Sequence, residues 1–327
     1  MQSILDLKTS ANPRRITLGM RNTGLPFMEK SDIATVVTNT TDDVVIVDPT
    51  GELSLFVNEI GGVVVNVSDI LGYASEIIFE RFGYDEERYE ITIFEFFESL
   101  GNLLSNDGLT PVQKSILSEC ISIMVRERKE CNIKGFLSIL KELDEKLAFL
   151  YGVLDSKYFS CKKERVYDSI KNRIVSFVLN SNSNFSAIEF LFVLKMVENK
   201  EHRLHENGFH RLWFFSKIDE NTGLEKESYY FSTFYKISRK YGAIVMLYSN
   251  EFEFFTKGEY SNSILNCTGD FAIGRQSKYD TDLLCKYFPL LKEQEELKEI
   301  VSNKERKEIV LTNGIKYEVV DFNDSKK

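Results

Sequence analysis

The sequence holds few of the residues that build metal sites or disulfide frameworks. Three histidines and five cysteines are spread over 327 residues, and no Cys-x-x-Cys pair occurs. An odd number of scattered cysteines favours free thiols in a reducing compartment. His202, His205 and His210 lie close together beside Glu201 and Glu206. We expect them in a solvated turn between a helix and a strand, with a metal site as the less favoured alternative.

Long apolar runs are absent as well. No stretch reaches the roughly 18 to 20 residues that a membrane-spanning helix needs, and the polar start, Met1 to Lys8, does not resemble a secretory signal. The net charge of −9 repels phosphate backbones, so nucleic-acid binding is not expected. We therefore expect a cytoplasmic protein without membrane insertion, which would reach the inner face of a membrane only through partner proteins.

Near the N-terminus, the sequence has the glycine spacing of a phosphate-binding loop but lacks the lysine and hydroxyl residues of such a loop. Residues 19–27 read Gly-Met-Arg-Asn-Thr-Gly-Leu-Pro-Phe. A P-loop has two glycines separated by four residues and followed by Lys-Ser/Thr. Gly19 and Gly24 have that spacing, but Leu25 and Pro26 occupy the lysine and hydroxyl positions. The motif predicts a nucleotide-binding scaffold that has lost its nucleotide chemistry.

Apolar runs alternate with helical patterns in both parts of the chain that flank residues 70–165. Continuous apolar runs are typical of strands buried on both faces of a parallel sheet, and their alternation with helices predicts right-handed crossovers. A hairpin turned at Asn313-Gly314 is expected at the end. The expected strands cover residues 14–18, 44–47, 63–67, 173–179, 209–216, 243–248, 271–274, 309–311 and 315–319, and the expected helices 27–38, 53–60, 185–198, 229–241, 280–288 and 293–301.

The middle of the chain has a helical pattern throughout. Thr110-Pro111-x-Gln113 predicts a helix start with a capping box, and apolar stripes at three- and four-residue steps follow it. We therefore expect an α/β fold with a mostly parallel sheet flanked by helices and an inserted helical bundle. Residues 1–69 would form the first part of the α/β domain, 70–165 the helical subdomain, and 166–327 the remainder with the hairpin.

The order of these motifs resembles the C-terminal ATPase domain of the type IV secretion and conjugative-transfer ATPases. The second strand ends in Asp48-Pro-Thr-Gly-Glu52, close to the family's Asp-Pro-Glu-Gly-Glu. Residues 107–117 are similar to its Gly-Leu-x-Pro-x-Glu segment, Arg239-Lys-Tyr-Gly242 to its Arg-Lys-x-Gly, and residues 264–276 to its Asn-Ser-Asp-Phe and Asn-Gln run. The resemblance covers nearly the whole chain and implies a P-loop NTPase-like (RecA-like) fold. The long N-terminal domain that such ATPases usually carry is expected to be absent.

The same resemblance shows where catalytic groups are missing. The P-loop lysine and hydroxyl, which would contact phosphates and magnesium, are replaced by Leu25 and Pro26, and proline also removes a backbone donor. Counted back from Arg239, the family's paired acids for magnesium and water activation fall on Ser216 and Lys217.

The remaining positions offer weak substitutes. Asp219 and Glu220 follow three residues later and could serve only with a shift in register, while the family's Thr-Gln sensor of the γ-phosphate appears as Tyr248-Ser249. Arg239 matches an arginine that could reach a neighbouring subunit's nucleotide, or it is a basic helix end opposing the helix dipole. We assign no catalytic or metal-binding residue, and Asp219, Glu220 and Arg239 stay weak candidates.

The resemblance implies a vestigial nucleotide site with six residues: Gly19, Asn22, Thr23, Gly24, Asp48 and Glu52. Alternatively, the glycines make a tight turn kept for packing, and Asp48 caps a helix or pairs locally. No cofactor is expected, and ATP with magnesium belongs only to the alternative of an active ATPase.

Three hypotheses follow. The favoured one is a catalytically degenerate relative of the conjugation ATPases, either a structural or regulatory subunit or a remnant of a mobile element. The second is a divergent ATPase that energises conjugative DNA transfer or secretion. The third is a protein-binding module without a nucleotide role. The expected partners are other proteins of the conjugation or secretion machinery, further copies of the chain, or an active ATPase homologue.

Overall fold

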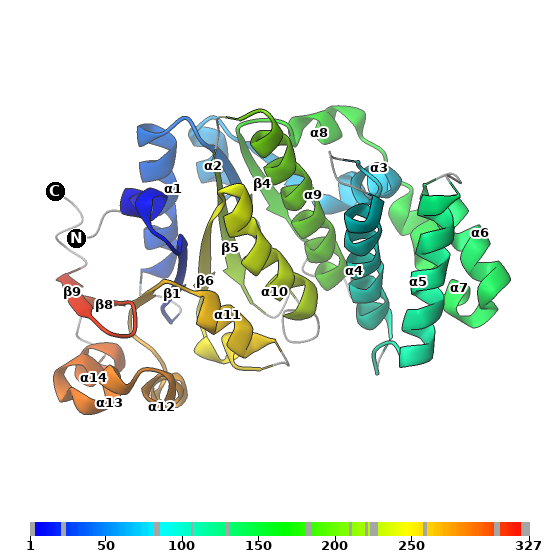
Figure 1. Cartoon of the computed structure of the whole chain (residues 1–327). Helices are drawn as coiled ribbons and strands as arrows, with labels where there is room; N and C mark the ends of the chain where they lie inside the picture. The colour runs from blue at the N-terminus through cyan, green and yellow to red at the C-terminus, as the bar shows by residue number, and fades with distance from the viewer. Residues whose placement is uncertain are drawn as a thin grey trace.

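The computed structural model describes residues 4–20, 24–81, 86–105, 107–127, 131–180, 185–208, 211–219, 222, 228–257, 260–303 and 308–321. These residues form one nine-stranded sheet with helices on both faces (Figure 1). The strands are β1 (Arg14–Leu18), β2 (Asp43–Val47), β3 (Val63–Asn66), β4 (Ile174–Val178), β5 (Leu212–Ile218), β6 (Ile244–Ser249), β7 (Asp270–Ile273), β8 (Glu308–Thr312) and β9 (Tyr317–Asp321).

The strand order is β3-β4-β2-β5-β6-β1-β7-β8-β9. All pairs from β3 to β7 are parallel, and only the terminal hairpin adds antiparallel pairs. Strand β2 shows why the sequence folds this way, because its run Val44 to Val47 is buried on both faces between β4 and β5. The expected mostly parallel α/β architecture is therefore confirmed.

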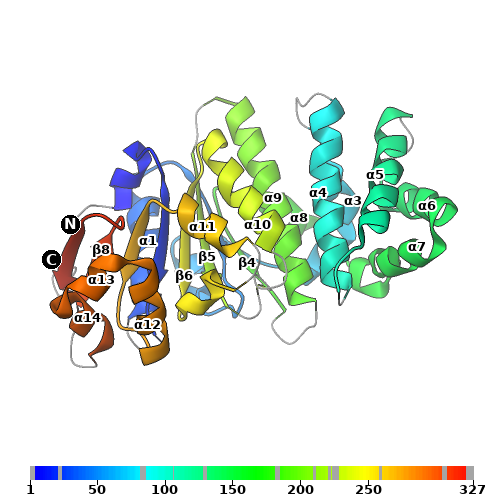
Figure 2. The same ribbon diagram turned by 60° about the horizontal axis from the view of Figure 1, so that its bottom comes forward.

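Two helical layers cover the sheet (Figures 1 and 2). One apolar cluster joins helices α1 and α2 to one face of the sheet, and a second, larger cluster joins α9, α10 and α11 to the other. The helices are α1 (Leu25–Asn39), α2 (Ser54–Glu59), α3 (Ala74–Ile78), α4 (Glu86–Leu104), α5 (Pro111–Arg126), α6 (Ile133–Leu143), α7 (Glu145–Tyr151), α8 (Glu164–Ser169), α9 (Ser186–Glu206), α10 (Ser228–Ile237), α11 (Ser261–Cys267), α12 (Lys278–Tyr287), α13 (Pro289–Glu293) and α14 (Glu295–Ser302). None of the helices in the described ranges is long and apolar enough to cross a membrane.

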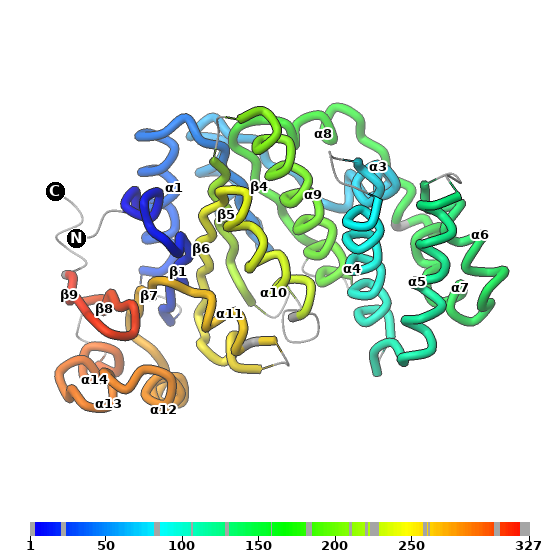
Figure 3. The backbone as a smooth tube through the Cα atoms, viewed as in Figure 1, coloured from blue at the N-terminus to red at the C-terminus, as the bar shows by residue number. Residues whose placement is uncertain are grey.

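The helical segment between β3 and β4 stands at one end of the molecule, and the β8–β9 hairpin stands at the other (Figure 3). The capping box predicted for α5 is present, since Thr110 accepts from the backbone of Gln113 and Gln113 accepts from Thr110. Within the bundle, the rings of Phe97 on α4 and Phe136 on α6 stack with centroids 3.9 Å apart. Aromatic packing thus joins these helices into one body with the larger core cluster.

The histidine-rich segment differs from the expectation. We expected a helix over 185–198 followed by a solvated turn, but α9 continues to Glu206, and Glu201 and His202 are only 2% and 4% exposed. Burial raises the pKa of Glu201 and lowers the pKa of His202 to about 4. The expected solvated turn is therefore wrong for Glu201 and His202, because tertiary contacts extend the helix beyond its apolar pattern, whereas His205 and Glu206 are exposed in the last turns of α9. Lys200, one of the residues in the extension, binds Asp43 of β2 at 2.8 Å. His210 lies outside the described residues.

Candidate functional site

The P-loop-like turn leaves the carboxyl end of β1, between β6 and β7. The Gly19 amide donates to the carbonyl of Ser249 (3.1 Å), and the Met20 amide donates to the carbonyl of Arg275 (2.9 Å). Gly24 has a φ of +92°, a backbone conformation that favours glycine, and α1 begins directly after it. The first two amides of the turn therefore hold neighbouring segments together. Asn22 and Thr23 lie outside the described residues.

The position of the P-loop lysine is buried. Leu25 is 3% exposed and belongs to the apolar cluster that joins α1 to the sheet, together with Ile33 and Val36. Pro26 follows in the first turn of α1, where its ring is compatible with the helix but offers no amide hydrogen. This side of the turn lacks both the cation and one of the backbone donors that bind phosphate in a working P-loop.

Asp48 and Glu52 leave the carboxyl end of β2 and have different local partners. The Asp48 carboxylate, which is 1% exposed, accepts from the Leu53 amide (2.6 Å) and the Thr50 hydroxyl (3.3 Å). Asp48 is therefore hydrogen-bonded within the loop that leads from β2 to α2. Glu52 instead binds the ammonium group of Lys217 at 3.0 Å.

The pairing of β5 with β2 shows which residues occupy the positions of the paired acids of the ATPase family. Val47 of β2 pairs with Ser216 of β5. The next residues, Asp48 and Lys217, therefore lie beside each other at the carboxyl ends of the two strands. Asp219 comes after the end of β5, is half-buried, and accepts at its backbone carbonyl from the amide of Thr222 (3.2 Å). A lysine therefore stands where the resemblance requires an acid. Glu220 lies outside the described residues.

Sequence reasoning missed Glu29, the buried acid of this site. Glu29 is 4% exposed, and its Oε1 has no hydrogen-bond partner among the described residues. Burial, together with the negative charge of Asp48, raises its pKa to about 8 against the opposing charge of Lys217. The signal was in the sequence: Glu29 lies four residues after Leu25 and four before Ile33, so a charge interrupts the apolar stripe of α1.

The position of the γ-phosphate sensor lies in β6, and Arg239 lies in the segment that precedes β6. Tyr248, at the sensor position, is fully buried, and its hydroxyl donates to Asp32 of α1 at 2.7 Å. Burial raises the pKa of Asp32 to about 6 despite this hydrogen bond and the nearby charge of Arg15. Arg239 is exposed in the 3-10 helix Ser238–Tyr241, which precedes β6. Arg239 therefore lies at the amino end of β6, whereas the P-loop-like turn of the same chain lies at the carboxyl end of the neighbouring strand β1.

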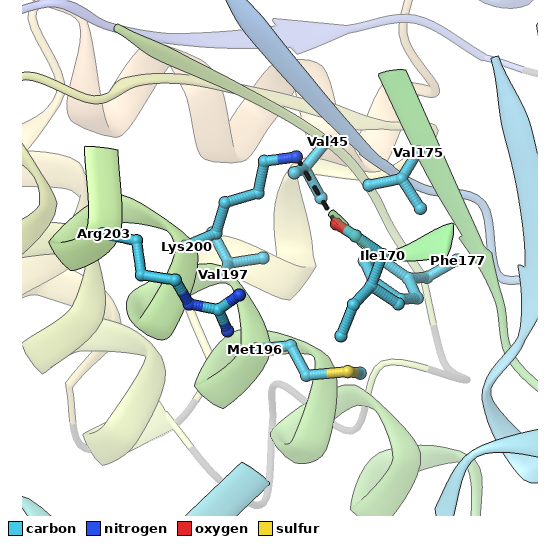
Figure 4. Close-up of a pocket in the computed structure, with 8 residues that line it drawn as sticks. All are labelled: Val45, Ile170, Val175, Phe177, Met196, Val197, Lys200 and Arg203. Carbon is cyan, nitrogen blue, oxygen red and sulfur yellow. Dashed lines mark hydrogen bonds between the residues drawn. The ribbon is translucent and has the colours of Figure 1, made fainter. Parts of the chain in front are cut away.

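A cavity between β2, β4 and α9 contributes no ligand site (Figure 4). Its volume is about 10 Å³, roughly the space for one water molecule. The ammonium group of Lys200 at its wall donates to the carbonyls of Ile170 and Asn172 and pairs with Asp43, and burial lowers the pKa of Lys200. The part of the chain that the structure describes contains no group of three or more His, Cys, Asp or Glu side chains able to hold a metal ion.

No family model matches the chain, and no curated protein matches it either. Among solved structures, VirB4 of Thermoanaerobacter pseudethanolicus matches 94% of this chain and 88% of its own, with a TM-score of 0.73 and 14% identity. The plasmid coupling protein TrwB in complex with the non-hydrolysable GTP analogue GDPNP matches 97% of this chain and 85% of its own, with a TM-score of 0.57 and 14% identity. The fold is that of VirB4 and TrwB.

The likeness to VirB4 and TrwB confirms the resemblance inferred from the motifs at the level of the fold. TrwB has also been solved with ADP and Mg²⁺, and that structure matches 94% of this chain and 84% of its own at a TM-score of 0.56 and 14% identity. A shared fold at this identity does not carry function with it. The chemistry of this chain rests on its own side chains.

Proposed function

We propose that the chain is a catalytically degenerate relative of the conjugation and type IV secretion ATPases that acts as a structural or regulatory subunit. Its partners would be other proteins of the conjugation or secretion machinery, further copies of the chain, or an active ATPase homologue. The observation that carries the proposal is the burial of Leu25, because a side chain 3% exposed within an apolar cluster replaces the cation that would bind the β- and γ-phosphates.

The charges around Leu25 support the same conclusion. Glu29 and Asp48 are buried acids beside the turn, and Lys217 is paired with Glu52. A triphosphate placed here would meet the carboxylate of Asp48 and the uncharged carboxyl of Glu29, while Lys217 is already engaged by Glu52. Since electrostatic repulsion is strongest in a poorly hydrated environment, the buried charge of Asp48 opposes phosphate binding more than a surface acid would.

Calorimetric titration of ATP and ADP, with and without magnesium, tests the proposal. The wild-type chain is expected to give no binding, whereas Leu25→Lys/Pro26→Ser/Glu29→Gln should bind, because the triple change restores the cation and the amide donor and removes an acid that would pair with the new lysine. Leu25→Met/Pro26→Ala is the matched control, since it alters the same helix start without adding a charge. Magnesium-dependent ATP hydrolysis by the wild type, abolished in Asp219→Asn, would refute the proposal in favour of a divergent ATPase.

A further inference from the structure

A second cavity lies where strands β1 and β7 begin. The P-loop-like turn lies at the opposite, carboxyl end of β1. The volume of the cavity is about 200 Å³, and β1, β7 and the β8–β9 hairpin supply its walls. Arg15 near the start of β1 pairs in register with Asp270 at the start of β7, and Lys316 and Glu318 come from the hairpin. The cavity is therefore separated from the candidate nucleotide site by the length of the strands.

Arg15 is the buried cation of this cavity. Its side chain is 7% exposed, and its Nε has no hydrogen-bond partner among the described residues. No carboxylate of the described residues forms an ion pair with it, although its charge opposes the rise in the pKa of two nearby acids, Asp270 in the neighbouring strand and Asp32, which accepts from Tyr248. A buried guanidinium without a direct anionic partner is costly, so an anion that enters the cavity gains charge-assisted hydrogen bonds.

The hairpin turn is already satisfied internally. The Thr312 hydroxyl donates to the Lys316 carbonyl at 2.8 Å and accepts from the Gly314 amide at 2.9 Å. The Asn313 side chain accepts from the amides of Ile315 (3.0 Å) and Lys316 (2.9 Å). The wall of the cavity is therefore preorganised, and a ligand need not order the turn on binding.

The charges around the cavity alternate in sign. Arg15 and Lys316 are cationic, while Asp270 and Glu318 are acidic, with Asp270 half-buried and both hairpin residues exposed. The two carboxylates would repel a ligand with two negative charges, and Arg15 would repel a ligand that carries only a positive charge. A ligand with one charge of each sign finds a partner for both.

The volume limits the ligand as well. About 200 Å³ falls below the ~300 Å³ at which pockets for drug-sized ligands begin, so the cavity favours a small ligand. We propose that this cavity binds a small zwitterion of the α-amino-acid class, with its carboxylate on the guanidinium of Arg15 and its ammonium group between Asp270 and Glu318.

Calorimetry on the full chain with three matched compounds tests the charge requirement. L-Leucine carries both groups, 4-methylvalerate lacks the ammonium, and isoamylamine lacks the carboxylate; glycine and L-phenylalanine test smaller and larger zwitterions. We expect at least one zwitterion to bind, and each single-charge analogue of leucine to bind about tenfold more weakly than leucine or not at all. The absence of binding by all three zwitterions at about 10 mM, or equal binding of leucine and its analogues, would overturn the proposal.

Variants locate the binding. Arg15→Met should weaken binding of the best zwitterion by about tenfold or more, and Glu318→Gln, at an exposed position, by about threefold. Glu296→Gln, an exposed change on α14 outside the cavity lining, is the control and should leave binding unchanged. If Arg15→Met fails to fold, Glu318→Gln decides alone. Binding that neither variant changes would place the zwitterion elsewhere and refute the assignment.

Discussion

Glu29 offers the sharpest test of how the candidate site is built. The change is Glu29→Gln, which keeps the shape of the side chain and removes only its ability to ionise. In the native protein, burial holds the pKa of Glu29 at about 8, well above the 4.5 of an exposed glutamate. Because the native state binds the proton more tightly than the unfolded chain, this carboxyl stabilises the fold below pH 4.5. That contribution is lost as the pH rises through 8.

The size of the effect follows from the interval between 4.5 and about 8. At about 1.4 kcal/mol for each pH unit, the wild type loses roughly 3 to 5 kcal/mol of unfolding free energy over this range through Glu29 alone. Most domains have only about 5 to 15 kcal/mol in total, so the loss is large. The variant should match the wild type at pH 5 within about 1 kcal/mol and be more stable by several kcal/mol at pH 9.

Urea denaturation at a series of pH values between 5 and 9 measures this difference directly. Comparing variant with wild type at each pH cancels the titrating groups that do not interact with Glu29. Glu59→Gln, an exposed change on the neighbouring helix α2, removes a carboxyl of the same kind and serves as the control. A difference between Glu29→Gln and wild type that stays constant with pH would show that Glu29 is not held neutral by burial, and the electrostatic account of the site would be wrong.

Two further changes test the helical segment. Thr110→Ala should cost about 1 kcal/mol in urea denaturation because it removes the hydroxyl that accepts from Gln113, whereas Thr110→Ser should retain the cap; equal losses in both variants would contradict this. Gly101→Ala should destabilise by about 1 to 3 kcal/mol or more, since a Cβ there would lie 2.3 Å from the Tyr151 hydroxyl and 2.6 Å from Leu109. Tyr151→Phe in the Gly101→Ala background should recover part of that loss, and an unchanged denaturation midpoint for Gly101→Ala would refute the clash.

The strands of the parallel sheet could be predicted because their sequence signal is local. Runs such as Val44 to Val47 are apolar at every position, which only a strand buried on both faces requires. The order of the strands in the sheet was not predicted, because it depends on pairs that are distant in sequence, such as β1 with β6. The extension of α9 could not be predicted, because its last turns are polar and are held by partners distant in sequence, such as Asp43 for Lys200.

Some features of the candidate site could also be predicted from the sequence, and others could not. Leucine and proline at the lysine and hydroxyl positions could be recognised from the P-loop spacing, and Lys217 at the position of an acid by counting back along the chain. The pairing of Lys217 with Glu52 could not, because it joins β5 to a loop 165 positions earlier. Glu29 was visible as a charge in an apolar stripe, but its burial beside Asp48 depends on how α1 lies on the sheet.

These features act together, which explains why restoring one residue would not restore the site. A lysine introduced at position 25 would lie one helical turn from Glu29, since side chains four residues apart share a helix face. In a poorly hydrated environment the new ammonium group would pair with that carboxylate and lower its pKa, because an opposite charge favours the ionised form. The cation would then be neutralised before any phosphate arrived. We therefore expect phosphate binding only when Leu25→Lys is combined with Glu29→Gln.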